Sequence, residues 1–258
     1  MAAVTISSMD TAVYIESIER DGQLLAEAAE LAGLGAPVPT CPEWRVRDLL
    51  AHLGQVHRWA TRYVAEGLTE PVRPPTVPGP EGAELIEWFR DGHRRLVATL
   101  AAAPPDLECW TFLPAPSPLG FWARRQAHEL AIHRVDAQAA LGAEFSPFQA
   151  DFAADGIDEI TVGFHGLATS KARTPVPRTL RIRATDTGDV WTMRLSHEAP
   201  HTIRAQHPPE GKADCELGGT ASALYLMLWN RLPLDEVSVT GDASLADLWR
   251  EKSTIGRK

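Results

Sequence analysis

Residues 121–137 read FWARRQAHELAIHRVDA, a run whose spacing is that of a helix with polar side chains on its apolar face. Glu129 and His133 are four residues apart, so they are neighbours on the surface of that helix. The same face carries Trp122 and Ala137. A buried charge without a partner is costly. The acid and the imidazole therefore need a partner, and a divalent metal ion is a candidate.

Helical periodicity extends outward from this run over the first two thirds of the chain. The sequence Thr40-Cys41-Pro42-Glu43 has the spacing of a capping box with an early proline, and it is expected to start the second helix. The predicted helices cover about 10–31, 43–65, 81–102 and 121–141. Four helices of this length favour a four-helix bundle.

The pattern changes in the last third of the chain. Residues 179–184 and 190–195 alternate with period two around the turn sequence Thr187-Gly188-Asp189, which predicts a hairpin. Further helices are predicted over 151–168, 221–231 and 244–250, and further strands over 201–206 and 214–217. The predicted fold class is α+β, with a four-helix bundle over 1–148 and a small α+β domain over 149–258. A competing boundary lies at 171–178.

Composition excludes several classes of protein. The chain has 258 residues, 44% of them hydrophobic and 23% charged, which is typical of a globular protein with a sizeable core. A net charge of −9 argues against nucleic-acid binding. No apolar run has the ~20 residues that span a bilayer, and the start of the chain does not resemble a signal peptide. Three widely separated cysteines indicate a reducing compartment. A cytoplasmic location is expected.

Helical geometry selects a third candidate ligand. His52 and His57 lie on one predicted helix and point roughly 140° apart, so both cannot face one metal ion. His52 lies at the edge of the apolar face. His128 and His133 are separated by the same angle, roughly 140°, and His128 falls among arginines, where solvent exposure is expected. The inward set is therefore His52, Glu129 and His133. Two histidines and one glutamate form a known zinc ligand set that leaves a fourth position open.

A plainer interpretation remains open from the residues alone. Glu129 and His133 can form a simple ion pair, with His52 merely packed at a helix edge. The pattern Glu-x-x-x-His is common by chance, whereas a zinc motif such as HExxH is far more specific.

Two segments carry a resemblance to a known family. Residues 38–54, VPTCPEWRVRDLLAHLG, and residues 125–137, RQAHELAIHRVDA, resemble the second-helix and fourth-helix signatures of the mycothiol-dependent maleylpyruvate isomerases. That family is a branch of the DinB-like four-helix bundles and joins its bundle to a small α+β C-terminal domain. The resemblance implies that His52, Glu129 and His133 bind zinc. It also implies a functional arginine on a C-terminal helix, which corresponds to Arg231 here.

The resemblance further implies chemistry with a low-molecular-weight thiol, which in actinobacteria is mycothiol. A metal-bound thiol is deprotonated, and the thiolate is the nucleophile. The expected activity is a thiol-dependent isomerase or an S-transferase acting on a small electrophilic or unsaturated acid. The divalent metal is expected to be zinc, with nickel or iron left open. A non-catalytic binding protein and a zinc hydrolase are the alternatives, although no general base for hydrolysis is identified.

Asp136 and Arg231 have two interpretations each, and Cys41 has one. Asp136 is a candidate acceptor for an N–H of His133, but Arg134 is expected to pair with it at the surface. Cys41 precedes His52 by about three turns and is expected to lie outside the site. Arg231 either grips a carboxylate or compensates a helix dipole.

Overall fold

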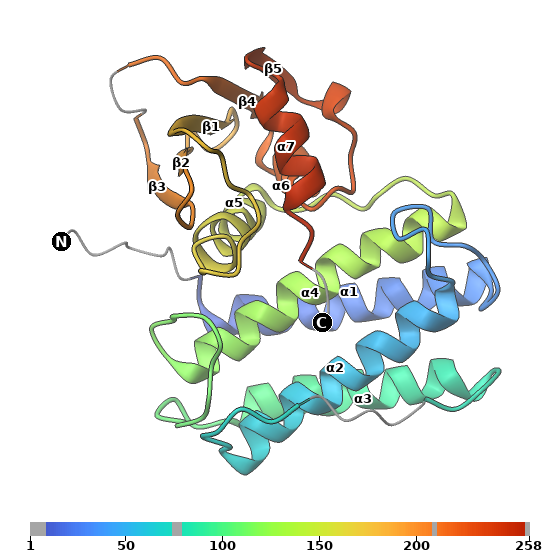
Figure 1. Cartoon of the computed structure of the whole chain (residues 1–258). Helices are drawn as coiled ribbons and strands as arrows, with labels where there is room; N and C mark the ends of the chain where they lie inside the picture. Colours follow the sequence, from blue (N-terminus) through green and yellow to red (C-terminus); the bar gives the residue numbers. More distant parts are fainter. Residues whose placement is uncertain (1–8, 74–78, 208–210, 256–258) are drawn as a thin grey trace. The chain divides into compact units, whose positions relative to one another are not determined.

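Four long helices form the N-terminal unit of the computed structural model, which describes residues 9–73, 79–207 and 211–255 (Figure 1). They are α1 (Thr11–Ala32), α2 (Val46–Glu66), α3 (Glu84–Ala102) and α4 (Pro118–Leu141). Helix α1 packs against α3 and α4, and α2 packs against the same two helices. This unit is the predicted bundle. Within the described ranges, no helix is both long and apolar enough to cross a membrane.

The ends of α1 and α4 are fixed by local hydrogen bonds. The Asp10 carboxylate accepts the N–H of Ala12 at 2.9 Å, and the Ser117 hydroxyl accepts the N–H of Gly120 at 3.0 Å. Gly142 ends α4 in the left-handed conformation, with φ of 72°. Such caps satisfy backbone groups that the helix leaves unpaired.

Helix α2 begins later than the sequence predicts. Its first residue is Val46 rather than Glu43. The predicted capping box at Thr40 is wrong. The cap lies farther along, where the Asp48 carboxylate accepts the backbone N–H of Arg45 at 2.8 Å. Residues 38–44 form a tight turn before the helix, closed by a 3.0 Å hydrogen bond from the Val38 N–H to the Trp44 carbonyl.

Helix α4 is buried around nearly its whole circumference. Arg134, expected at the surface, is only 1% exposed. Its Nε lies 3.4 Å from the Asp21 carboxylate on α1, and its Nη1 donates to Gln138 at 2.9 Å. These contacts satisfy charges that the apolar surroundings would otherwise penalise. They also tie α1 to α4.

Aromatic packing sets α2 against α4. The Tyr63 ring of α2 stacks on Trp122 of α4 with centroids 4.8 Å apart, and Trp59 meets the same indole edge-on at 5.1 Å. The Trp122 Nε1 donates to the Trp110 carbonyl at 3.0 Å. Large aromatic side chains contribute much of the burial energy of a core. This cluster fixes the position of α2 along α4, and with it the place of His52.

The C-terminal unit is an α+β fold around one five-stranded sheet of order β3-β2-β1-β4-β5. Its strands are β1 (Arg178–Ala184), β2 (Val190–Leu195), β3 (His201–Ala205), β4 (Cys215–Gly219) and β5 (Ser238–Gly241). Its helices are α5 (Ala150–Asp158), which continues into a π-helical turn (Glu159–Phe164), α6 (Ala221–Leu228) and α7 (Ser244–Lys252). The β1–β2 hairpin is antiparallel as predicted, and β1 also pairs with β4 in parallel. The fold class is α+β, as the sequence predicts.

Three details of this unit differ from the sequence prediction. The α-helix that starts at Ala150 ends at Asp158, well before the predicted end at residue 168. Strand β5 was not predicted at all. Helix α6 ends at Leu228, because Asn230 adopts a φ of 61°, a left-handed conformation that stops a helix. Arg231 therefore follows the helix instead of ending it.

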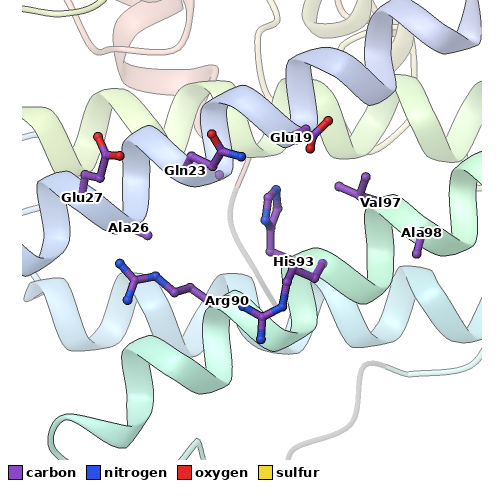
Figure 2. A pocket seen from close by; sticks show the side chains of 10 residues that line it. Glu19, Gln23, Ala26, Glu27, Arg90, His93, Val97 and Ala98 are labelled. Carbon is purple, nitrogen blue, oxygen red and sulfur yellow. The ribbon is translucent and has the colours of Figure 1, made fainter.

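A groove of about 460 Å³ lies between α1 and α3 (Figure 2). His93 points from α3 toward α1 and is largely buried. Its Nε2 lies 2.8 Å from the carbonyl oxygen of Ile18, to which it donates. The ring occupies the place where a side chain at Gly22 would sit: a Cβ there would fall 2.2 Å from the same nitrogen. Close packing of α1 and α3 thus requires a glycine at this position.

We expect Gly22→Ala to destabilise the bundle. Alanine is intrinsically better in a helix by about 1 kcal/mol, but the displaced imidazole would lose a buried hydrogen bond and create overpacking. The net loss should be about 1–3 kcal/mol, measured by denaturant unfolding. Gly35→Ala is the matched control, since a Cβ at Gly35 meets no atom within 4 Å. Unchanged or increased stability of Gly22→Ala would show that the ring moves without cost.

Candidate metal centre

Helices α2 and α4 bring His52, Glu129 and His133 together. The Nε2 of His52 lies 2.9 Å from Oε1 of Glu129, and the Nε2 of His133 lies 3.5 Å from the same oxygen. The candidate donor atoms of the three residues all lie within 4.8 Å of one another. The three side chains that helical geometry selected therefore meet at one point.

The donor set has the chemistry and the spacing of a zinc-type site. Zinc–nitrogen and zinc–oxygen bonds of about 2.0–2.1 Å imply that ligand atoms of a tetrahedral site lie about 3.3 Å apart. The two distances to Glu129, 2.9 and 3.5 Å, lie on either side of that value. The Glu129 side chain is 22% exposed, and His52 and His133 are each 9% exposed. Three protein ligands with access to solvent match a catalytic site better than a closed structural one.

Asp136 holds the imidazole of His133. Its Oδ2 lies 2.7 Å from Nδ1 of His133, and the carboxylate is completely buried. The expectation that Arg134 pairs with Asp136 at the surface is wrong. Arg134 points toward Asp21 and Gln138 instead. A carboxylate that accepts from Nδ1 fixes the tautomer of the ring and leaves the lone pair on Nε2. The Nε2 atom is the one directed at Glu129.

Arg125 is a member of the site that the sequence analysis missed. Its Nη2 donates to Oε2 of Glu129 at 2.8 Å from a nearly fully buried position. The signal was present, because Arg125 and Glu129 are four residues apart on one helix. Oε2 is thus engaged, while Oε1 faces the two histidines.

The electrostatics of the cluster favour a positive charge at its centre. Burial alone would raise the pKa of Glu129, but its contacts with the His133 and His52 imidazoles and the charge of Arg125 hold that pKa well below its usual range. Burial alone would lower the pKa of His133, but Asp136 and Glu129 raise it above its usual value. The carboxylates that favour a proton on the imidazole also favour a cation between the ligands.

The turn before α2 forms one wall of the cluster. The Trp44 indole stacks on the His133 ring at 5.7 Å, with an interplanar angle of 22°, and lies 5.1 Å from the His52 ring. The Cys41 Sγ donates to Oδ2 of Asp136 at 3.6 Å. The expectation that Cys41 lies far from the site assumed that it continued the helix. The chain turns back instead, and the Cys41 thiol contacts Asp136, which in turn contacts the candidate ligand His133.

Two other histidines lie outside the cluster. His57 points away from it and is buried against Phe89 and His93, with ring centroids 5.3 and 5.8 Å away. Burial, with the neighbouring His93, holds its pKa well below the usual value. His128 was expected in solvent, but it is fully buried and lies 6.2 Å from the Tyr14 ring. It belongs to the core and contributes nothing to the candidate ligand set.

Comparison with known proteins identifies the family. Residues 16–138 match the family model of the mycothiol maleylpyruvate isomerase N-terminal domain, and residues 151–248 match that of the C-terminal domain. The chain belongs to the mycothiol-dependent maleylpyruvate isomerase family. None of the curated proteins compared with it matches.

Two crystal structures with the fold of this family resemble the chain. One is of the mycothiol-dependent maleylpyruvate isomerase, with a TM-score of 0.63, and the other is of a histidine-to-alanine mutant of that enzyme, with a TM-score of 0.64. In each case the identity is 14%, and the match covers 92% of this chain and 95% of the other. At this identity the comparison establishes the fold.

Arg231, the residue that the family resemblance suggests for the C-terminal unit, lies directly after α6. Its Nη1 donates to the carbonyl of Trp229 at 2.7 Å, and its backbone N–H donates to the carbonyl of Leu226 at the same distance. These bonds close the end of α6. They leave the functional role of Arg231 as a prediction.

We expect the purified protein to bind one equivalent of zinc, and we expect the His133→Ala variant to lose that zinc. Removing the imidazole deletes one of three ligands and leaves the Asp136 carboxylate without that donor. Metal content after desalting, measured by atomic absorption, is the test. His128→Asn is the control, since this histidine lies in the same helix but outside the cluster. Equal metal content in both variants would exclude the assignment of His133 as a ligand.

Proposed function

We propose that this protein is a metal-dependent enzyme that uses a low-molecular-weight thiol, mycothiol in the first instance, to isomerise a small unsaturated acid. The observation that carries the proposal is the convergence of His52, Glu129 and His133 on one point. Family membership supplies the reaction class. The preferred metal is zinc, because two imidazoles and one carboxylate with an open fourth position are a common catalytic zinc arrangement.

Each side chain of the cluster has a distinct task in this proposal. His52 and His133 present neutral Nε2 atoms, and Glu129 presents Oε1 as an anionic ligand. Arg125 keeps Glu129 ionised through a 2.8 Å charge-assisted hydrogen bond. Asp136 keeps the proton of His133 on Nδ1. When bound, zinc would hold a thiol as its thiolate, the nucleophilic form.

The reaction itself needs no redox partner. The thiolate sulfur forms a bond to one carbon of the cis double bond, and the π electrons move toward the conjugated carbonyl oxygen. The former double bond can then rotate. Return of the electrons re-forms the double bond in the trans geometry and breaks the carbon–sulfur bond, which releases the thiolate. Isomerisation therefore regenerates the thiol. An S-transferase would instead protonate the carbanion and keep the carbon–sulfur bond.

We expect metal-loaded protein to convert maleylpyruvate to its trans isomer in the presence of mycothiol, without net consumption of thiol. His52→Ala should lower this rate roughly 100-fold or more, the scale on which single electrostatic contributors to catalysis act. His128→Asn is the control. The measurements are the absorbance of the unsaturated acid and the titration of free thiol.

The same assay separates the other classes of function. Consumption of one thiol per substrate would identify an S-transferase. Hydrolytic cleavage of the substrate without thiol would identify a hydrolase. Metal-loaded, folded protein that is inert toward a panel of electrophiles would contradict the enzyme proposal and favour a binding protein.

We further propose that residues 1–148 form the metal-binding domain, that residues 149–258 form a separate α+β domain, and that Arg231 of this second domain binds a carboxylate. The guanidinium fork suits a planar carboxylate.

Substitution of Arg231 tests this role. Arg231→Gln should raise KM for a diacid substrate about 10- to 100-fold, as expected for the loss of charged hydrogen bonds, while metal content stays unchanged. Arg194→Gln is the control, since Arg194 is an exposed arginine of β2 in the same unit. A wild-type KM in Arg231→Gln would exclude the carboxylate role and leave Arg231 as a helix-end residue.

A further inference from the structure

The turn at residues 38–44 contacts the candidate metal centre through a residue that the proposed function does not use. The Thr40 hydroxyl donates to Oδ1 of Asp136 at 2.5 Å. The other oxygen of that carboxylate, Oδ2, receives Nδ1 of His133 at 2.7 Å. Thr40 and His133 thus hold opposite oxygens of one buried carboxylate. A chain of two hydrogen bonds links the turn to a candidate ligand.

We propose that Thr40 is a positioning residue for the metal centre, acting on His133 through Asp136. This inference rests on the proposed function, because it concerns how the same site is held. A carboxylate rotates about its terminal torsion, which is soft. An acceptor that must hold one imidazole nitrogen in a fixed direction therefore benefits from a second donor on its other oxygen. Thr40 provides that donor.

The turn is built to hold the hydroxyl in place. The Cys41 N–H donates to the Val38 carbonyl at 2.9 Å, and the Val38 N–H donates to the Trp44 carbonyl at 3.0 Å. The first bond closes the turn immediately around Thr40. The second brings Trp44 to the position where its indole stacks on His133. The turn thus fixes the imidazole from two directions, through the carboxylate and through the ring face.

Burial increases the effect of the hydroxyl. Asp136 has no exposed surface, so a lost donor is not simply replaced by bulk water. Outer partners of metal ligands typically contribute 10- to 100-fold to metal affinity. Thr40 acts one bond farther out, and we expect its hydroxyl to contribute about tenfold, the lower end of that range.

The test compares zinc affinity, by competition with a chromophoric chelator, between wild type, Thr40→Val and Thr40→Ser. Valine keeps the shape and removes the hydroxyl, whereas serine keeps the hydroxyl. We expect about tenfold weaker binding in Thr40→Val and recovery in Thr40→Ser. Thr61→Val is the matched control. It removes a hydroxyl of α2 that donates to the His57 carbonyl at 2.7 Å, away from the candidate metal centre. Equal affinity of wild type and Thr40→Val would overturn the proposal.

A double-mutant cycle separates positioning from a general effect on the fold. If Thr40 acts through Asp136, then Thr40→Val should cost little further affinity once Asp136→Asn is present. Additive losses would overturn the proposal, because independent sites add. The visible spectrum of the cobalt-substituted protein is a second readout, which should change in Thr40→Val and stay unchanged in Thr61→Val.

A measurement on the wild-type protein covers the case in which Thr40→Val does not fold. By NMR of the metal-free protein, the hydroxyl proton of Thr40 should exchange slowly with water, and His133 should carry its proton on Nδ1. Fast exchange of that hydroxyl would overturn the proposal. A wild-type protein that binds no zinc but shows both signals would instead contradict the proposed function and leave the hydrogen-bonded chain intact.

Discussion

The hydrogen bond between His133 and Asp136 is the interaction on which the candidate site depends. Asp136 is completely buried, and a buried carboxylate is stable only when donors surround it. His133 is one turn away on the same helix and supplies one donor. Satisfying the carboxylate thereby decides which imidazole nitrogen carries a proton and which one faces Glu129. The same contact therefore satisfies a buried carboxylate of the core and orients His133 for the metal binding that we propose.

The ligand candidates could be found from the sequence because helical periodicity is a local property. The 3.6-residue repeat places Glu129 and His133 on one face and separates His52 from His57 without knowledge of the tertiary structure. Which other elements pack against each face of a helix is not a local property, so it could not be predicted in the same way. His128 was expected in solvent because arginines flank it, yet tertiary packing buries it completely.

The outer part of the site was harder to predict for the same reason. The capping pattern at Thr40 favoured a helix start there, but the Thr40 side chain donates to a carboxylate 96 positions away. The long-range hydrogen bond, rather than the local capping motif, determines where the Thr40 side chain lies. In the C-terminal unit, period two identified the β1–β2 hairpin, whose partners are close in sequence. The short β5 and the parallel pairing of β1 with β4 depend on partners brought together only by the fold.

The 77 positions that separate His52 from Glu129 have a consequence for folding and turnover of the protein. During synthesis α2 leaves the ribosome well before α4, so the ligand set does not exist until the last helix of the bundle docks. A metal ion bound there, as proposed, would close a long loop of chain and would link the second helix to the fourth. Scarcity of that ion would then shorten the lifetime of the folded bundle against proteolysis, in addition to removing its chemistry.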